Sequence, residues 1–221
     1  MFKFIALIPA RGGSKGIKNK NLKRINGYSL TELAIKTAIK SKIFSKIILS
    51  SDNQSILDSG KKYKIILHQR PKIISQDTSH ISETIIEVKK KFNLNEDCYL
   101  IILEPTSPLR KISDIKNVHR EILKYNYDSI CTFAEAFTIP YRSWILNKKK
   151  MKPFLLDNKN VWVNRQKFTK FYQAIGNVIG VNLNKFKHDI LFGKKGHLLV
   201  EKSRALDIDD IEDLKIVKKI F

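Results

Sequence analysis

The sequence predicts a single α/β domain built on a mostly parallel sheet. Apolar runs of strand length recur at residues 4–10, 47–52, 64–67 and 98–103, and segments of helical character separate them. This β-α-β-α-β order favours parallel strands joined by right-handed crossovers. A chain of 221 residues is also long enough to bury one substantial hydrophobic core.

The first strand leads into a basic loop rich in glycine, which is the most informative stretch of the chain. The loop contains Arg11, Gly12, Gly13, Ser14, Lys15, Gly16, Lys18, Lys20 and Asn21. Glycine lets backbone N–H groups approach a ligand closely, and neighbouring cations favour an anion such as a polyphosphate. The spacing fits neither the P-loop nor the dinucleotide motif. A solvated basic turn is the alternative, but the position directly after the first strand favours a ligand-binding loop.

The helices are predicted from caps and periodicity. Ser29 and Glu32 have the spacing of a capping box and open a helix that runs to about Lys40. A second helix passes through Ile56 and Leu57, and a third spans 81–92. We expect Ser79 or Ser82 to cap the third helix.

After the strand at 98–103, two prolines restrain the backbone of the loop 104–110. A helix over 113–125 and a strand over 129–133 are predicted next. The alternation then breaks, because 137–172 contains short strands, turns and two tryptophans. Aromatic residues on irregular segments are typical of a surface that packs on another chain.

The last part of the chain offers a candidate metal site. A strand bounded by glycines is predicted over 176–181, and acidic residues at 207–213 open the C-terminal helix. Asp207 and Asp209 lie two apart on extended chain and so point the same way, which suits Mg²⁺ held by carboxylates and phosphate oxygens. Acidic residues also favour helix N-termini, and we expect Asp210 to serve there.

Composition excludes some classes of function. The formal charge is +21, which is typical of a partner of nucleic acid, but 34 of the 42 cations are lysines spread along the whole chain. We therefore expect no nucleic-acid partner. Cys98 and Cys131 show no metal spacing and predict reduced thiols in a cytoplasmic protein. The apolar runs are too short for a signal peptide or a membrane span, so no membrane partner is expected.

Three segments carry a family resemblance. Residues 4–21, 104–110 and 207–209 resemble, in order and spacing, the signatures of CMP-sialic acid synthetases (acylneuraminate cytidylyltransferases). The resemblance implies a three-layer α/β/α nucleotidyltransferase fold, Rossmann-like, with residues 1–221 forming one cytidylyltransferase domain. It also implies a small dimerisation subdomain, an arm inserted at about 137–172, and hence a homodimer.

The implied reaction is transfer of CMP from CTP to the anomeric hydroxyl of a nine-carbon 2-keto acid sugar of the N-acylneuraminate type. Pyrophosphate is released, and Mg²⁺, or alternatively Mn²⁺, is the implied cofactor. Legionaminic, pseudaminic or 3-deoxy-manno-octulosonic acid are alternative acceptors. A non-enzymatic nucleic-acid-binding protein is the rival function, and the charge alone motivates it.

The resemblance also assigns site residues. The implied nucleotide-binding residues are Arg11, Gly12, Gly13, Ser14, Lys15, Lys20, Asn21, Arg70 and Ser82. The implied sugar-binding residues are Glu104, Thr106, Ser107, Arg142, Arg165 and Gln166. The implied catalytic residues are Lys15, Asp207 and Asp209, the last two as metal ligands.

The chain departs from the family pattern at two places that the resemblance puts near the sugar. The family most often has glutamine where this chain has Glu104, and the order of residues in 176–180 is altered. From residue chemistry alone, we expect Arg110 to stabilise its loop.

Overall fold

The computed structural model describes the whole chain except residues 1, 95–96, 139, 149 and 156–168. Its centre is a seven-stranded sheet in the order β11-β7-β10-β6-β1-β4-β5. These strands are β1 (Lys3–Pro9), β4 (Lys46–Ser51), β5 (Ile66–Gln69), β6 (Cys98–Ile102), β7 (Ser129–Glu135), β10 (Tyr172–Asn182) and β11 (Lys195–Leu199).

The sheet is mostly parallel, which confirms the predicted class. β5, β4, β1 and β6 run parallel to one another, and β7 and β11 run parallel to each other. β10 is antiparallel to both β6 and β7, between which it lies. β5 begins later than the predicted 64–67, because the N–H of Ile65 still bonds to the carbonyl of Tyr63 in a turn. β11 was not predicted.

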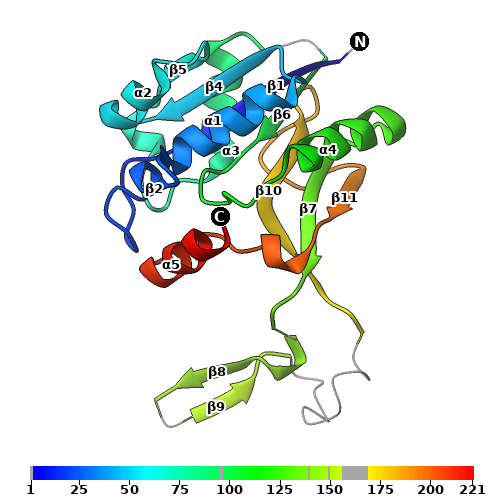
Figure 1. Ribbon diagram of the computed structural model, residues 1–221. Helices are drawn as coiled ribbons and strands as arrows, with labels where there is room; N and C mark the ends of the chain where they lie inside the picture. The colour runs from blue at the N-terminus through cyan, green and yellow to red at the C-terminus, as the bar shows by residue number, and fades with distance from the viewer. Residues whose placement is uncertain (1, 95–96, 139, 149, 156–168) are drawn as a thin grey trace.

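Helices cover both faces of the sheet and make three layers (Figure 1). The helices are α1 (Leu30–Ser41), α2 (Gln54–Gly60), α3 (Ile81–Lys91), α4 (Ile112–Tyr125) and α5 (Ile211–Ile220). Side chains alternate along β1: Phe4, Ala6 and Ile8 pack with α1, α2 and α4, whereas Ile5 and Leu7 pack with α3. This alternation is the period of a strand buried on both faces.

The helix caps partly follow the prediction. The Ser29 hydroxyl accepts from the Glu32 N–H at 3.1 Å, and the Glu32 carboxylate accepts from the Ser29 N–H at 2.8 Å, which confirms the capping box. The predicted cap of α3 is wrong, since His80 occupies the N-cap position without a side-chain bond. The Ser79 hydroxyl instead accepts from the Gln76 N–H in the preceding loop.

The C-terminal helix returns to the loop that follows β1. Ile17 from that loop, Ile25 and Leu30 form a small core with Ile208, Leu214 and Val217. Ile25 belongs to a hairpin of β2 (Arg24–Ile25) and β3 (Tyr28–Ser29), which was not predicted. Asp210 caps α5 as expected, because its carboxylate accepts from the N–H groups of Glu212 and Asp213.

The connection from β7 to β10 forms an arm that extends away from the body (Figure 1). It contains the hairpin of β8 (Trp144–Asn147) and β9 (Lys150–Pro153), which forms a separate two-stranded sheet. Large apolar side chains are exposed along it: Trp144, Ile145, Leu146, Met151 and Phe154. The tryptophan segment at 161–163 lies outside the described residues.

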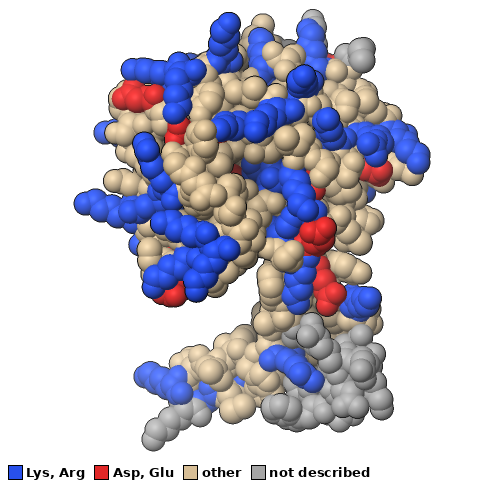
Figure 2. Space-filling model, in the orientation of Figure 1, with Lys and Arg blue, Asp and Glu red and all other residues tan. Residues whose placement is uncertain are grey.

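Short 3-10 turns span Lys20–Leu22, Lys72–Ile74, Pro140–Arg142 and Lys202–Arg204. The thiols of Cys98 and Cys131 are buried and are not part of a disulfide. In the part of the chain that the structure describes, each helix is too short or too polar to cross a membrane. Figure 2 shows Lys and Arg side chains scattered over one face of the body rather than gathered in a single patch.

Candidate active site

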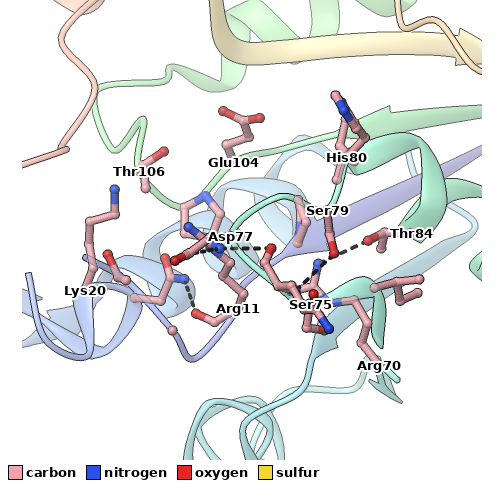
Figure 3. Close-up of a pocket in the computed structure, with 18 of the residues that line it drawn as sticks. Arg11, Lys20, Arg70, Ser75, Asp77, Ser79, His80, Thr84, Glu104 and Thr106 are labelled. Carbon is pink, nitrogen blue, oxygen red and sulfur yellow. Dashed lines mark hydrogen bonds and ion pairs between the residues drawn. The ribbon is translucent and has the colours of Figure 1, made fainter. Parts of the chain in front are cut away.

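A pocket of about 330 Å³ opens at the carboxyl ends of the parallel strands. Arg11 follows β1, Arg70 follows β5 and Glu104 follows β6, and all three line it. Ligands of open parallel sheets bind at this edge. The site therefore lies where the glycine-rich loop predicts it (Figure 3).

Close packing explains two glycines of the loop and leaves a third open. The Gly12 N–H donates to Asp52 Oδ1 at 2.9 Å, and a Cβ at Gly12 would lie 2.7 Å from that of Asn53. A Cβ at Gly16 would collide with the backbone carbonyl of Asp209. Gly13 lines the pocket, as Ser14 does, with open space where its Cβ would lie. The loop is thus anchored on both sides while its centre faces the cavity.

Three cations of this loop are paired with acidic residues from distant segments. Arg11 Nη1 donates to Asp77 Oδ1 at 2.7 Å, and Lys15 Nζ lies 3.0 Å from Asp77 Oδ2. Lys20 Nζ lies 3.0 Å from Asp209 Oδ1. These hydrogen bonds, from Lys15 first and then Arg11, lower the pKa of Asp77 below its usual range. The Lys15 side chain is 82% exposed and that of Lys20 only 13%.

Asn21 supports the loop from beneath. The side-chain amide of Asn21 donates to the Arg11 carbonyl at 2.9 Å, and the backbone carbonyl of Asn21 accepts from the Thr31 hydroxyl. It is buried, it lines the pocket, and its Oδ1 has no hydrogen-bond partner among the described residues. Asn21 therefore fixes the backbone of Arg11 and leaves an acceptor at the floor of the pocket.

Arg70 is buried, and part of its guanidinium group has no hydrogen-bond partner among the described residues. Nη1 donates to the Thr84 hydroxyl at 3.1 Å, whereas Nε and Nη2 lack partners among the described residues. Burial lowers its pKa. Buried donors without partners are rare in proteins, so Arg70 is prepared to donate to a ligand.

Ser82 does not line the pocket, contrary to its assignment as a nucleotide contact. It lies within the first turn of α3, whereas Ser75, Ser79 and Thr84 reach the cavity.

The opposite side of the pocket is acidic. The Glu104 carboxyl group packs against Gly176 of β10, where a Cβ would collide with it. Burial, and then the charge of Asp207, raise the pKa of Glu104 to about 7. Figure 3 draws no interaction to this carboxyl group. Arg110 is buried and donates to the backbone carbonyls of Glu104 and Asn177, so it stabilises the loop as expected.

Ser107 was predicted to bind the sugar, but it is buried and does not line the pocket. Its hydroxyl donates to Asp207 Oδ1 at 3.0 Å. Neighbouring Thr106 does line the pocket, and its carbonyl accepts from the Ile208 N–H at 2.9 Å. The loop 104–110 thus holds the segment that carries Asp207 against the cavity.

Asp207 and Asp209 both line the pocket, as their spacing predicts. Among the described residues, no group of three or more His, Cys, Asp or Glu side chains could hold a metal ion. Mg²⁺ is commonly bound by one or two carboxylates together with substrate phosphates. The donor set fits an ion that arrives with a nucleotide rather than one held by protein alone.

The arm residues stand apart from this pocket. Arg142 ends an exposed turn of the arm and does not line the cavity of the same chain. Arg165 and Gln166 lie outside the described residues. Sequence reasoning missed Asp52, Asp77, Ser75, Ser79 and Thr84. Asp52 could have been found from the polar end of its strand, whereas Asp77 carried no local signal.

Three relatives resemble the chain over almost its full length. Pseudaminic acid cytidylyltransferase of Campylobacter jejuni is 28% identical, covering 99% of this chain and 96% of that protein. The post-translational flagellin modification protein B of Campylobacter coli is 28% identical (99% and 94%). CMP-N,N'-diacetyllegionaminic acid synthase of Legionella pneumophila is 27% identical (99% and 96%).

Solved structures share the fold at low identity. CMP:2-keto-3-deoxy-manno-octonic acid synthetase complexed with CTP has a TM-score of 0.70 at 12% identity, covering 99% of this chain and 98% of that one. A 4-diphosphocytidyl-2C-methyl-D-erythritol synthase has a TM-score of 0.70 at 10% identity (100% and 99%). The family model described as Cytidylyltransferase matches residues 5–196. The chain therefore belongs to the cytidylyltransferase family of nucleotidyltransferase enzymes.

Proposed function

We propose that the protein transfers CMP from CTP to the anomeric hydroxyl of a nine-carbon 2-keto acid sugar and releases pyrophosphate. The observation that carries the proposal is a strand-end pocket with cations and an open glycine on one side and three carboxylates on the other. The names of the relatives favour an acid of the pseudaminic or legionaminic type. N-acetylneuraminic and 3-deoxy-manno-octulosonic acid are the other candidates.

On the nucleotide side, Arg11 and Lys15 bind the triphosphate together with the backbone at Gly13. The unpaired nitrogens of Arg70 donate to the cytosine end, where the side chains of Ser75 and Ser79 also reach the pocket. Cations and donors placed beside the phosphates stabilise the charge that develops on the leaving pyrophosphate.

On the acceptor side, Glu104 and Thr106 orient the sugar so that its anomeric oxygen attacks the α-phosphorus in line. Asp207, held by Ser107, and Asp209, held by Lys20, would bind Mg²⁺ or Mn²⁺. A bound Mg²⁺ would neutralise phosphate charge and increase the electrophilicity of phosphorus. A carboxylate beside the acceptor can also accept the proton of the attacking hydroxyl.

We further propose a homodimer in which the arm completes the site of the neighbouring subunit with Arg142 and Arg165. The exposed apolar side chains of the arm support this. Mixing Arg165→Ala subunits with Lys15→Ala subunits should restore part of the activity, because one site of the hybrid carries neither change. A monomer by light scattering, or no rescue after verified subunit exchange, would refute it. Buried reduced thiols support a cytoplasmic location.

The test is mass spectrometry after incubation with Mg²⁺, CTP and a panel of 2-keto acid sugars. We expect a CMP-sugar with at least one acid, and no product when ATP or GTP replaces CTP. Lys15→Ala should lower turnover by about 10²-fold, the loss typical of one donor to developing charge. Its thermal midpoint should not change, because the side chain is exposed. Absence of product across the panel would reject the proposal, and salt-sensitive binding to random DNA would favour the rival function.

A further inference from the structure

Asp77 lies between the two cations that we assign to the triphosphate. Its Oδ1 accepts from Arg11 Nη1 at 2.7 Å, and its Oδ2 lies 3.0 Å from Lys15 Nζ. Both carboxylate oxygens are therefore engaged by groups of the glycine-rich loop, more than sixty positions earlier in the chain. Figure 3 shows the contact between Arg11 and Asp77 inside the pocket.

The loop that carries Asp77 is held by other residues. The Ser79 hydroxyl accepts from the Gln76 N–H at 3.1 Å and donates to the Ile73 carbonyl. The Ser75 hydroxyl donates to the Pro71 carbonyl at 2.9 Å. Asp77 does not cap α3, whose N-cap is His80. Within the described residues, the ion-pair partners of its carboxylate are Arg11 and Lys15 of the glycine-rich loop.

The anionic carboxylate occupies the donors that a phosphate oxygen would use. Arg11 also donates to the Gln76 carbonyl at 3.1 Å through the same Nη1, so both N–H groups of this nitrogen have acceptors. A triphosphate that takes these donors must break the contacts with Asp77, and it is repelled by the charge of Asp77 if that side chain stays.

We propose that Asp77 is a built-in competitor of the triphosphate for Arg11 and Lys15. Asp77 pairs with both cations before CTP binds. Its contacts with them break when the triphosphate of CTP binds, and they form again as pyrophosphate leaves. Asp77 thereby weakens the binding of CTP and speeds product release. This inference rests on the proposed function, because that function assigns Arg11 and Lys15 to the phosphates.

The test is isothermal titration of CTP, and separately of inorganic pyrophosphate, into wild-type and Asp77→Asn protein without sugar. Asparagine keeps the shape and removes the charge. We expect both dissociation constants to fall roughly three- to tenfold, as when two exposed ion pairs need not be broken on binding. Asp58→Asn is the matched control, since Asp58 of α2 forms an exposed ion pair with Lys61 at 2.7 Å, and it should leave both constants unchanged.

The sign of the change decides between two roles for Asp77. If Asp77 instead orients Arg11 and Lys15 in the complex, the Asp77→Asn variant will bind CTP more weakly than wild type. Weaker binding or equal affinity would each overturn the proposal. If Asp77→Asn does not fold, Asp77→Ser serves the same comparison. In a Lys15→Ala background the gain from Asp77→Asn should shrink, because only the contact with Arg11 remains.

The two proposals fail in different ways. Wild-type protein that binds CTP but converts no acid would refute the proposed function, and the comparison of Asp77→Asn with wild type would still decide this inference. Wild-type protein that binds neither CTP nor pyrophosphate would refute both.

Discussion

The two sides of the pocket handle charge in different ways. On the nucleotide side the loop cations have acidic partners, Asp77 for Arg11 and Lys15 and Asp209 for Lys20. On the acceptor side Glu104 lies against the backbone of Gly176, and its pKa is about 7. On the nucleotide side, an anion can bind when the cations exchange their acidic partners for it. The other side holds a carboxyl group whose ionisation depends on its surroundings.

The largest effect on this difference between the two sides is expected when the charge of Asp207 or Asp209 is removed. Asp207→Asn and Asp209→Asn should each lower kcat by about two orders of magnitude or more, because the charge on CTP would then lack its metal. EDTA should abolish turnover, and Mg²⁺ or Mn²⁺ should restore it.

Asp210→Asn is the matched control. Asp210 caps α5, and asparagine is an equally good N-cap, so only the charge at the helix end is lost. We expect a cost of about 0.3–1 kcal/mol in unfolding free energy and little change in kcat. An inactive Asp210→Asn variant beside an active Asp209→Asn variant would contradict the assignment of the metal ligands.

A second prediction concerns stability and pH. The raised pKa of Glu104, from 4.5 to about 7, means that the folded protein keeps a proton which the unfolded chain has released. Stability is therefore lost as pH rises from about 4.5 to 7. The Glu104→Gln variant should not show this loss. Its unfolding free energy minus that of wild type should therefore rise between pH 4.5 and pH 8, by at most about 3 kcal/mol. Urea denaturation in EDTA at several pH values would measure the two unfolding free energies. A difference between variant and wild type that stays constant with pH would contradict the prediction.

A third prediction concerns the choice of sugar. A carboxylate accepts hydrogen bonds, whereas an amide also donates, so Glu104→Gln should change the ratio of kcat/KM between acids by about 1.5–3 kcal/mol. Gly176→Ala should also shift the ratio, because a Cβ there displaces the carboxyl group. Gly13→Ala, at the open glycine of the nucleotide side, should leave the ratio unchanged. An unaltered preference in Glu104→Gln would place Glu104 outside the sugar site.

The sequence predicted well those features that local chemistry determines. The capping box at Ser29, the cap at Asp210 and the apolar run that forms β1 depend on residues a few positions apart. The position of the pocket follows from the parallel strands, whose carboxyl ends meet at one edge, and Asp207 and Asp209 both line it.

Features that depend on distant contacts were not predicted. Arg11 and Asp77 meet across the pocket, and Ser107 turns toward Asp207 because Ile208 is fixed to Thr106. β11 is added next to β7 without any periodic signal strong enough to find it. Such pairings are set by tertiary packing, which local propensity does not encode.

The position of β10 has a consequence for biogenesis. β6 ends at Ile102 and β7 at Glu135, yet their common neighbour begins only at Tyr172, after the arm. On the ribosome, β6 and β7 therefore emerge with unpaired edges that stay open until residue 182 has been made. Long-range pairing of this kind slows folding, and open edges can associate with other chains. The arm thus delays closure of the sheet, and substitutions in β10 should reduce the yield of folded protein during synthesis more than they change its chemistry once folded.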